Sequence, residues 1–131
     1  PEPAEGPFPA ELAAPEDGRA YANGGDEPIF RIRPSGAAAR FRFVFVTDDA
    51  IGTVTVNAAP ERNMAADGGD LTWRPSAKDA ENPAFPDIWS AAVKKRLERP
   101  ASLFWRVESL DAAGRRIGVS ATRRMVVFNT L

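Results

Sequence analysis

The chain has 131 residues, of which 44% are hydrophobic and 27% are charged, and its formal net charge is −1. This length and composition predict a single globular domain stabilised by a packed core. Because the chain contains no cysteine and no histidine, it has no disulfide, no thiolate metal site and no general base of the usual kind near neutral pH. The dispersed basic residues argue against nucleic-acid binding, and no apolar run approaches the roughly 20 residues that span a membrane.

The N-terminal segment differs in composition from the rest. Residues 1–9 contain four prolines, which favour an extended linker over a packed element. We therefore expect residues 1–9 to tether a domain that comprises residues 10–131. Residues 10–14 predict a first edge strand that ends at Pro15, and residues 16–18 and 23–26 are rich in turn formers.

Three segments with the alternation of half-buried strands follow. Residues 29–33 place Phe30 and Ile32 on one face. Residues 40–47 place Phe41, Phe43 and Phe45 together, and their second face is more apolar than a solvated face needs to be. Residues 53–57 form a β-branched segment. These patterns predict the second, third and fourth strands.

The next region combines a short strand with a helix. Residues 71–74, which include Trp73 and end before Pro75, predict the fifth strand. Between Asp87 and Glu98, apolar residues recur at helical spacing, and Pro100 ends the pattern. The expectation is an amphipathic helix within an insertion at residues 78–99.

A long strand and a turn near the C-terminus carry the strongest pattern. In residues 103–110, Leu103, Trp105 and Val107 share one face, which predicts that Trp105 is buried. Asp111 and Gly114 predict a tight turn, and residues 117–128 predict a seventh strand. Either alternating set of this last strand could face the core.

These segments together resemble the fibronectin type III-like domains of bacterial envelope and extracellular proteins. The resemblance rests on Pro28-Ile29-Phe30, residues 41–48, Leu71-Thr72-Trp73, and Phe104-Trp105-Arg106-Val107 with Asp111 and Gly114. It implies an all-β fold, a seven-stranded Greek-key sandwich, with strands one, two and five in one sheet and four, three, six and seven in the other. The short α-helix inserted between strands five and six departs from that pattern.

The outward face of the second sheet is the candidate interface. Arginines beside β-branched and aromatic residues are typical of an interface centre. The alternative is that the inserted helix, through Trp89 and its apolar neighbours, covers this face. The candidate residues are Arg42, Val44, Val46, Phe104, Arg106, Glu108 and Trp89.

The expected function is a non-enzymatic binding or spacer module of a bacterial cell-envelope protein, periplasmic or at the surface, or of a secreted one, with a protein as partner. The alternative is an accessory carbohydrate-binding domain of a polysaccharide-acting enzyme, with sugar contacts through Trp73 or Trp89. We expect no catalytic residue, metal or cofactor. Two pairs of aspartates, Asp48 with Asp49 and Asp67 with Asp70, could be considered as calcium ligands. Neither pair has the oxygen spacing of a calcium loop, so we expect these residues to form turns instead.

Overall fold

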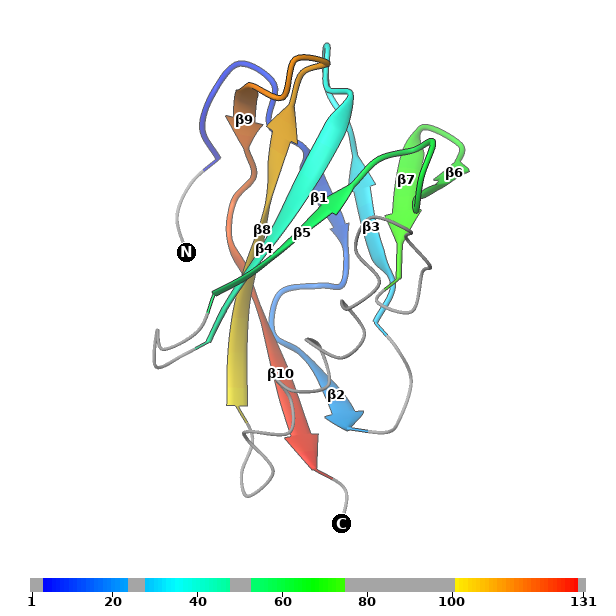
Figure 1. Cartoon of the computed structure of the whole chain (residues 1–131). Helices are drawn as coiled ribbons and strands as arrows, with labels where there is room; N and C mark the ends of the chain where they lie inside the picture. The colour runs from blue at the N-terminus through cyan, green and yellow to red at the C-terminus, as the bar shows by residue number, and fades with distance from the viewer. Residues whose placement is uncertain (1–3, 24–27, 48–52, 75–100, 130–131) are drawn as a thin grey trace.

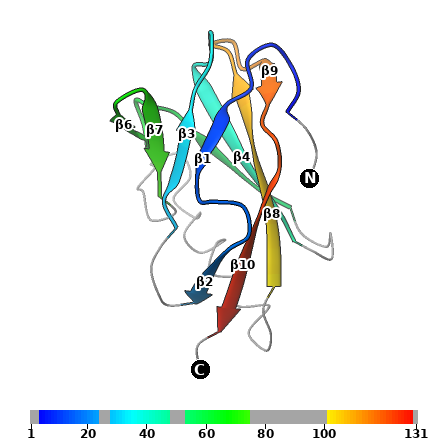
Figure 2. The same ribbon diagram turned by 180° about the vertical axis from the view of Figure 1, so that it is seen from behind.

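A computed structural model describes residues 4–23, 28–47, 53–74 and 101–129. These residues form ten strands in two sheets, which confirms the all-β prediction (Figures 1 and 2). The first sheet has the order β1 (Glu11–Ala14), β3 (Phe30–Arg33), β7 (Asp70–Trp73) and β6 (Ala65–Asp67). The second has the order β2 (Arg19–Asn23), β10 (Arg123–Asn129), β8 (Ala101–Leu110), β4 (Arg40–Thr47) and β5 (Thr53–Ala58), and β9 (Arg116–Val119) pairs with β8. The predicted helical insertion at residues 78–99 lies outside the described residues.

An aromatic cluster between the two sheets forms the centre of the core. Phe30 and Trp73 come from the first sheet, and Phe43 and Trp105 come from the second. The Phe30 ring lies edge-on to Trp105 with 4.9 Å between centroids, whereas Phe43 stacks on Trp73 at 4.8 Å. Trp105 is completely buried, as its alternating pattern predicts. The two sheets therefore pack as a β-sandwich around interlocking rings.

Two strands of the structure have no counterpart in the sequence prediction. β2 lies mostly between the two segments that we read as turns, residues 16–18 and 23–26, and it pairs in parallel with β10. β6 is only three residues long and forms an antiparallel pair with β7. Neither segment has an alternating apolar pattern long enough to predict a strand. All three residues of β6 are exposed, and β2 is a short segment with glycines on both sides. β2 is a strand because it pairs with a segment far away in the chain, which is a tertiary effect, whereas β6 pairs with β7 across the two-residue turn Gly68-Gly69 as a local hairpin.

The predicted seventh strand is interrupted. Residues 117–128 are divided between β9 and β10, which are separated around Ser120. At this break the Val107 amide donates to Ser120 Oγ at 2.8 Å, and the Ser120 amide donates to the Val107 carbonyl at 2.9 Å. Beyond it, Met125 lies opposite Leu103 and is completely buried. The structure thus supplies the register that the alternation left open.

The turn between β8 and β9 has the predicted chemistry. Asp111 Oδ1 accepts hydrogen bonds from the backbone amides of Ala113 and Arg115 at 3.0 and 2.9 Å. The bond from the Arg115 amide is the main reason that the pKa of the Asp111 carboxyl lies below its ordinary value. Gly114 has a positive φ of 84°, which favours glycine at this position.

The segment before β1 runs alongside β9. Glu5 and Val119 exchange two backbone hydrogen bonds of 2.8 Å, and the Phe8 amide donates to the Ile117 carbonyl at 3.1 Å. A Cβ at Gly118 would lie 2.4 Å from the backbone of Phe8, so this close approach requires glycine. The described part of the proline-rich segment, residues 4–9, therefore contacts the sandwich.

Candidate functional site

Six of the predicted interface residues are cross-strand neighbours. β4 and β8 pair antiparallel so that Arg42 lies opposite Glu108, Val44 opposite Arg106, and Val46 opposite Phe104. Residues directly opposite one another in such a pair project from the same face of the sheet. Their neighbours Phe43, Phe45 and Trp105 are in the core. The six residues thus form the outer face of the second sheet, and we call them, with their neighbours on this side, the outer face.

Glu108 is the electrostatic centre of the outer face. Its carboxylate is 9% exposed and accepts hydrogen bonds from Arg42 Nη1 at 3.1 Å and from Arg116 Nη1 at 3.3 Å. Arg42 Nε also lies 3.4 Å from Asn57 Oδ1 on β5. A nearly buried carboxylate needs such partners, because removing it from water without them is costly. Glu108 therefore links β4, β8 and β9 through its two arginines.

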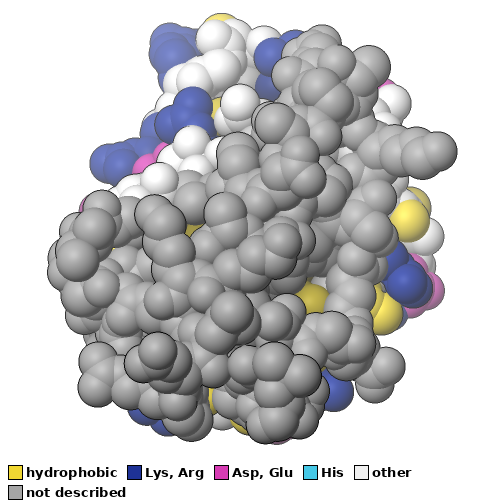
Figure 3. All heavy atoms as spheres, turned by 60° about the horizontal axis from the view of Figure 1, so that its bottom comes forward, with side chains coloured by type: hydrophobic (Ala, Val, Ile, Leu, Met, Phe, Trp, Pro, Cys, Tyr) yellow, Lys and Arg dark blue, Asp and Glu magenta, His cyan; other side chains and the backbone are white. Residues whose placement is uncertain are grey.

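Three further arginines belong to the outer face by register. Arg40 and Arg116 each lie opposite Leu110, and Arg124 lies opposite Phe104. Sequence analysis missed Arg124 because it did not fix which set of the last strand faces outward, and it missed Arg116 because this residue precedes the strand predicted at residues 117–128. Within the described part of the chain, no carboxylate lies at ion-pair distance from Arg40, Arg106 or Arg124. Figure 3 shows arginine side chains gathered along one flank of the molecule, in its upper left.

The apolar members of the outer face differ in exposure. Val44 is only 3% exposed although it projects away from the core, whereas Phe104 is 38% exposed. Val44 is therefore shielded from solvent, whereas Phe104 exposes part of its ring. Trp89, the seventh predicted interface residue, lies outside the described residues, and so does the segment predicted to form a helix that covers this face.

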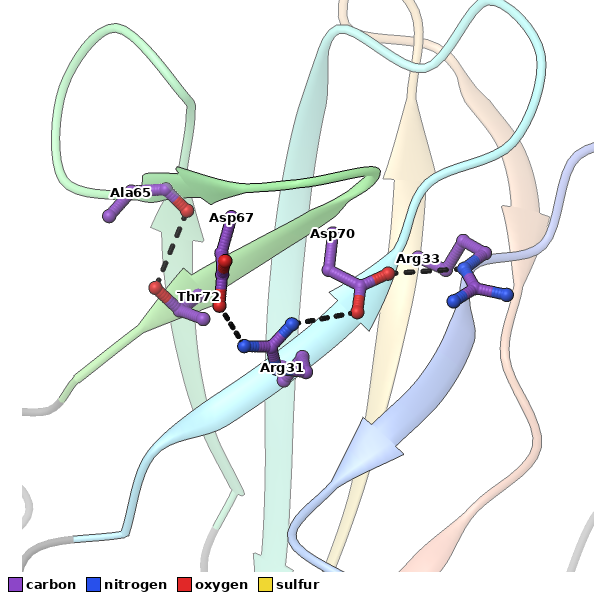
Figure 4. A network of polar contacts seen from close by, with 6 residues as sticks. All are labelled: Arg31, Arg33, Ala65, Asp67, Asp70 and Thr72. Carbon is purple, nitrogen blue, oxygen red and sulfur yellow. Dashed lines mark hydrogen bonds and ion pairs between the residues drawn. The ribbon is translucent and has the colours of Figure 1, made fainter.

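The first sheet carries a second polar network on its own outer face (Figure 4). Asp70 accepts from Arg31 Nη1 at 2.9 Å and from Arg33 Nε at 3.1 Å, and Arg31 also pairs with Asp67. Asp67 and Asp70, one of the two pairs considered as calcium ligands, are thus held by arginines across β3, β6 and β7. Asp48 and Asp49 lie outside the described residues. Among the described residues, no group of three or more acidic side chains could hold a metal ion.

This network makes the free energy of unfolding depend on pH. Hydrogen bonds from Arg31 and then from Arg33 hold the pKa of the Asp70 carboxyl below its ordinary value. A carboxyl with a depressed folded-state pKa contributes stability above its unfolded pKa of about 3.9, and loses it as the pH falls through the lower folded value. We therefore expect Asp70→Asn to destabilise the protein at pH near 7 and to cost progressively less in acid. Urea unfolding of the wild type and of Asp70→Asn, from acid to neutral pH, measures this difference in stability. A difference that does not change with pH would contradict the role of the Asp70 carboxylate as the partner of Arg31 and Arg33.

A shallow groove of about 630 Å³ lies between β1, the end of β3 and the start of β10. Its polar side chains include Arg33 and Arg123, but Arg33 binds Asp70 and Arg123 Nη1 donates to the Pro15 carbonyl at 2.8 Å. Binding sites are normally concave with polar groups that converge on a ligand. The two arginines of this groove therefore bond to other parts of the fold and do not converge on a ligand.

The tryptophans of the described strands do not form a sugar-binding surface. Trp73 is 2% exposed and Trp105 is completely buried. A ring that stacks on a sugar must expose a face, so the predicted sugar contact through Trp73 is wrong. Packing against Phe43 and Phe30 explains this residue.

Comparisons with protein-family models, with curated proteins and with solved structures found no match for this chain. In the described parts of the structure, no helix has the length and apolar character needed to cross a membrane.

Proposed function

We propose that this chain is a non-enzymatic binding module of a bacterial cell-envelope or secreted protein, and that its outer face contacts a protein partner. The observation that carries this proposal is the combination of exposed Phe104 with Arg106 and Arg124, neither of which has an ion-pair partner among the described residues. Aromatic residues and arginine are enriched at the energetically important centres of protein interfaces.

The finer fold assignment belongs to the same proposal. A fibronectin type III-like Greek-key sandwich is supported by the neighbours β1-β3-β7 in one sheet and β5-β4-β8-β10 in the other. Sandwiches of this kind serve as spacers and as binding modules, so the fold alone does not select the function. The exposed ring of Phe104 and the arginines around it favour binding. The envelope location is part of this proposal, and so is the tether through residues 1–9, of which residues 4–9 contact the sandwich.

Site-specific photo-crosslinking tests the proposed surface. A photoreactive phenylalanine analogue at Phe104 is expected to capture a discrete protein from the envelope fraction of the source organism. The matched control carries the analogue at Ile29, an equally exposed apolar residue at 40% that lies outside the outer face. Arg106→Glu should abolish the adduct at position 104 because it reverses the charge beside the ring, whereas Arg74→Glu should not. Identical adducts at both positions, or none at position 104, would refute the proposal.

A further inference from the structure

Strand pairing gathers positive charge on the outer face from arginines that are dispersed along the sequence. Five arginines project from this face by register, and Glu108 supplies the one carboxylate among the described residues that project with them. The arginines are Arg40, Arg42, Arg106, Arg116 and Arg124. Five positive charges and one negative charge give the outer face a local charge of +4, although the net charge of the chain is −1. A surface of one sign attracts partners of the opposite sign.

Glu108 compensates only part of this charge. Its carboxylate is already bonded to two of the arginines, at 3.1 and 3.3 Å. Within the described ranges, no carboxylate lies at ion-pair distance from the guanidinium groups of Arg106 and Arg124. Asp17 lies next to Arg124, but it accepts a hydrogen bond from the backbone amide of this residue at 2.7 Å and not from its guanidinium. The charges of Arg106 and Arg124 are therefore available to carboxylates of a partner.

These two arginines border the exposed ring of Phe104 on two sides. Arg124 lies opposite Phe104 on β10, and the Cβ atoms of such pairs are about 5 Å apart. Arg106 follows two residues after Phe104 on β8, on the same face and about 7 Å along the strand. Val46, which is partly buried, lies opposite Phe104 on β4. The result is an apolar centre with a guanidinium group on each of two sides.

We propose that the outer face binds an acidic segment of a partner protein, which places an apolar side chain on Phe104 and carboxylates on Arg106 and Arg124. This inference rests on the proposed function and specifies the chemistry of the partner. Arginine holds a carboxylate through two parallel hydrogen bonds, and these bonds are stronger where an apolar contact beside them excludes water. The apolar centre favours a protein over an anionic polysaccharide, because aromatic residues together with arginine are typical of the centres of protein interfaces.

An NMR titration of the isotope-labelled intact chain with synthetic peptides tests the chemistry of this partner. The peptide Glu-Asp-Glu-Leu-Asp-Glu-Asp is expected to shift the backbone amide signals of Phe104, Arg106 and Arg124, because it offers carboxylates on both sides of one apolar side chain. A peptide with lysine in place of every acid should shift none of them, because its charge repels the arginines. A peptide with serine in place of the leucine should bind more weakly, since it does not cover the ring.

Two substitutions that remove equal charge separate the site from the general charge of the face. Arg124→Ala should weaken binding of the acidic peptide about tenfold or more, because it removes a hydrogen bond to a charged group. Arg40→Ala removes the same charge from the same face, but Arg40 lies opposite Leu110, about 20 Å from Phe104 along β8. This distance exceeds the screening length of about 8 Å at physiological salt, so the control should weaken binding less than about twofold. The spectrum of each variant also shows that it is folded.

An acidic peptide that shifts no signal at Phe104, equal shifts with the lysine peptide, or equal losses in Arg124→Ala and Arg40→Ala would each overturn the acidic partner. Binding of polygalacturonate, an anionic polysaccharide, at these residues in place of the peptide would overturn it as well. The proposed function fails by a different result, the absence of a protein adduct at Phe104. A protein captured there whose capture the acidic peptide does not reduce would refute the acidic partner alone and leave the proposed binding surface in place.

Discussion

Phe30→Ala is expected to lower the free energy of unfolding by about 3–5 kcal/mol, the usual cost of removing a buried aromatic ring. The Phe30 side chain is completely buried, and its ring contacts Trp105 at 4.9 Å, Trp73 at 5.3 Å and Phe45 at 5.5 Å between centroids. These neighbours come from both sheets, so they cannot close around the cavity without moving the sheets together. Chemical denaturation followed by tryptophan fluorescence measures the loss.

The neighbouring residue supplies the control for this substitution. Ile29 is 40% exposed, and Ile29→Ala is expected to change stability by at most about 0.5 kcal/mol, as surface substitutions usually do. If both substitutions cost the same, Phe30 does not occupy the centre of the core that the ring contacts define.

Ser120→Ala is expected to cost about 1–3 kcal/mol, because it leaves the buried amide of Val107 without its acceptor. The hydroxyl of Ser120 accepts from this amide at 2.8 Å at the break between β9 and β10. Ser120 is only 1% exposed, so water has little access to replace the lost bond. The free energy of unfolding from urea titrations gives the magnitude.

Ser109→Ala is the matched control, since it removes the same hydroxyl from an equally buried serine. Ser109 is completely buried, and its Oγ has no hydrogen-bond partner in the described structure. Removing an unpaired buried hydroxyl relieves a desolvation cost, so this substitution should be neutral or stabilising. A larger loss at Ser109 than at Ser120 would contradict the hydrogen-bond assignment.

The strands with alternating apolar residues were predictable because one face of each is buried. In β4, Phe41, Phe43 and Phe45 are all in the core, and the opposite face carries Arg42 and Val44 as the pattern predicts. The same alternation placed Phe104 and Arg106 of β8 on the outer face. Once β4 and β8 are taken as neighbours, their outward residues must meet, so most of the candidate interface was accessible from sequence.

The features of the fold and of the outer face that could not be predicted from sequence depend on contacts between distant segments. β2 exists because it pairs in parallel with β10, more than 100 residues later in the chain, and no local pattern encodes such a pairing. Arg124 joins the outer face because Met125, rather than Arg124, lies opposite the core residue Leu103. Both alternating sets of residues 123–128 mix charge with apolar side chains, so composition could not choose between them.

The sequence by itself determined that this chain forms a β-rich domain without histidine or cysteine chemistry, and it determined which side of β3, β4 and β8 is buried. These properties follow from composition and from the period of two in each strand, which are local. Only the tertiary structure decided the division of the last strand at Ser120 and the arginines around Glu108 and Phe104. Each of these depends on which strands become neighbours and in what register, and that is set by packing of the whole core.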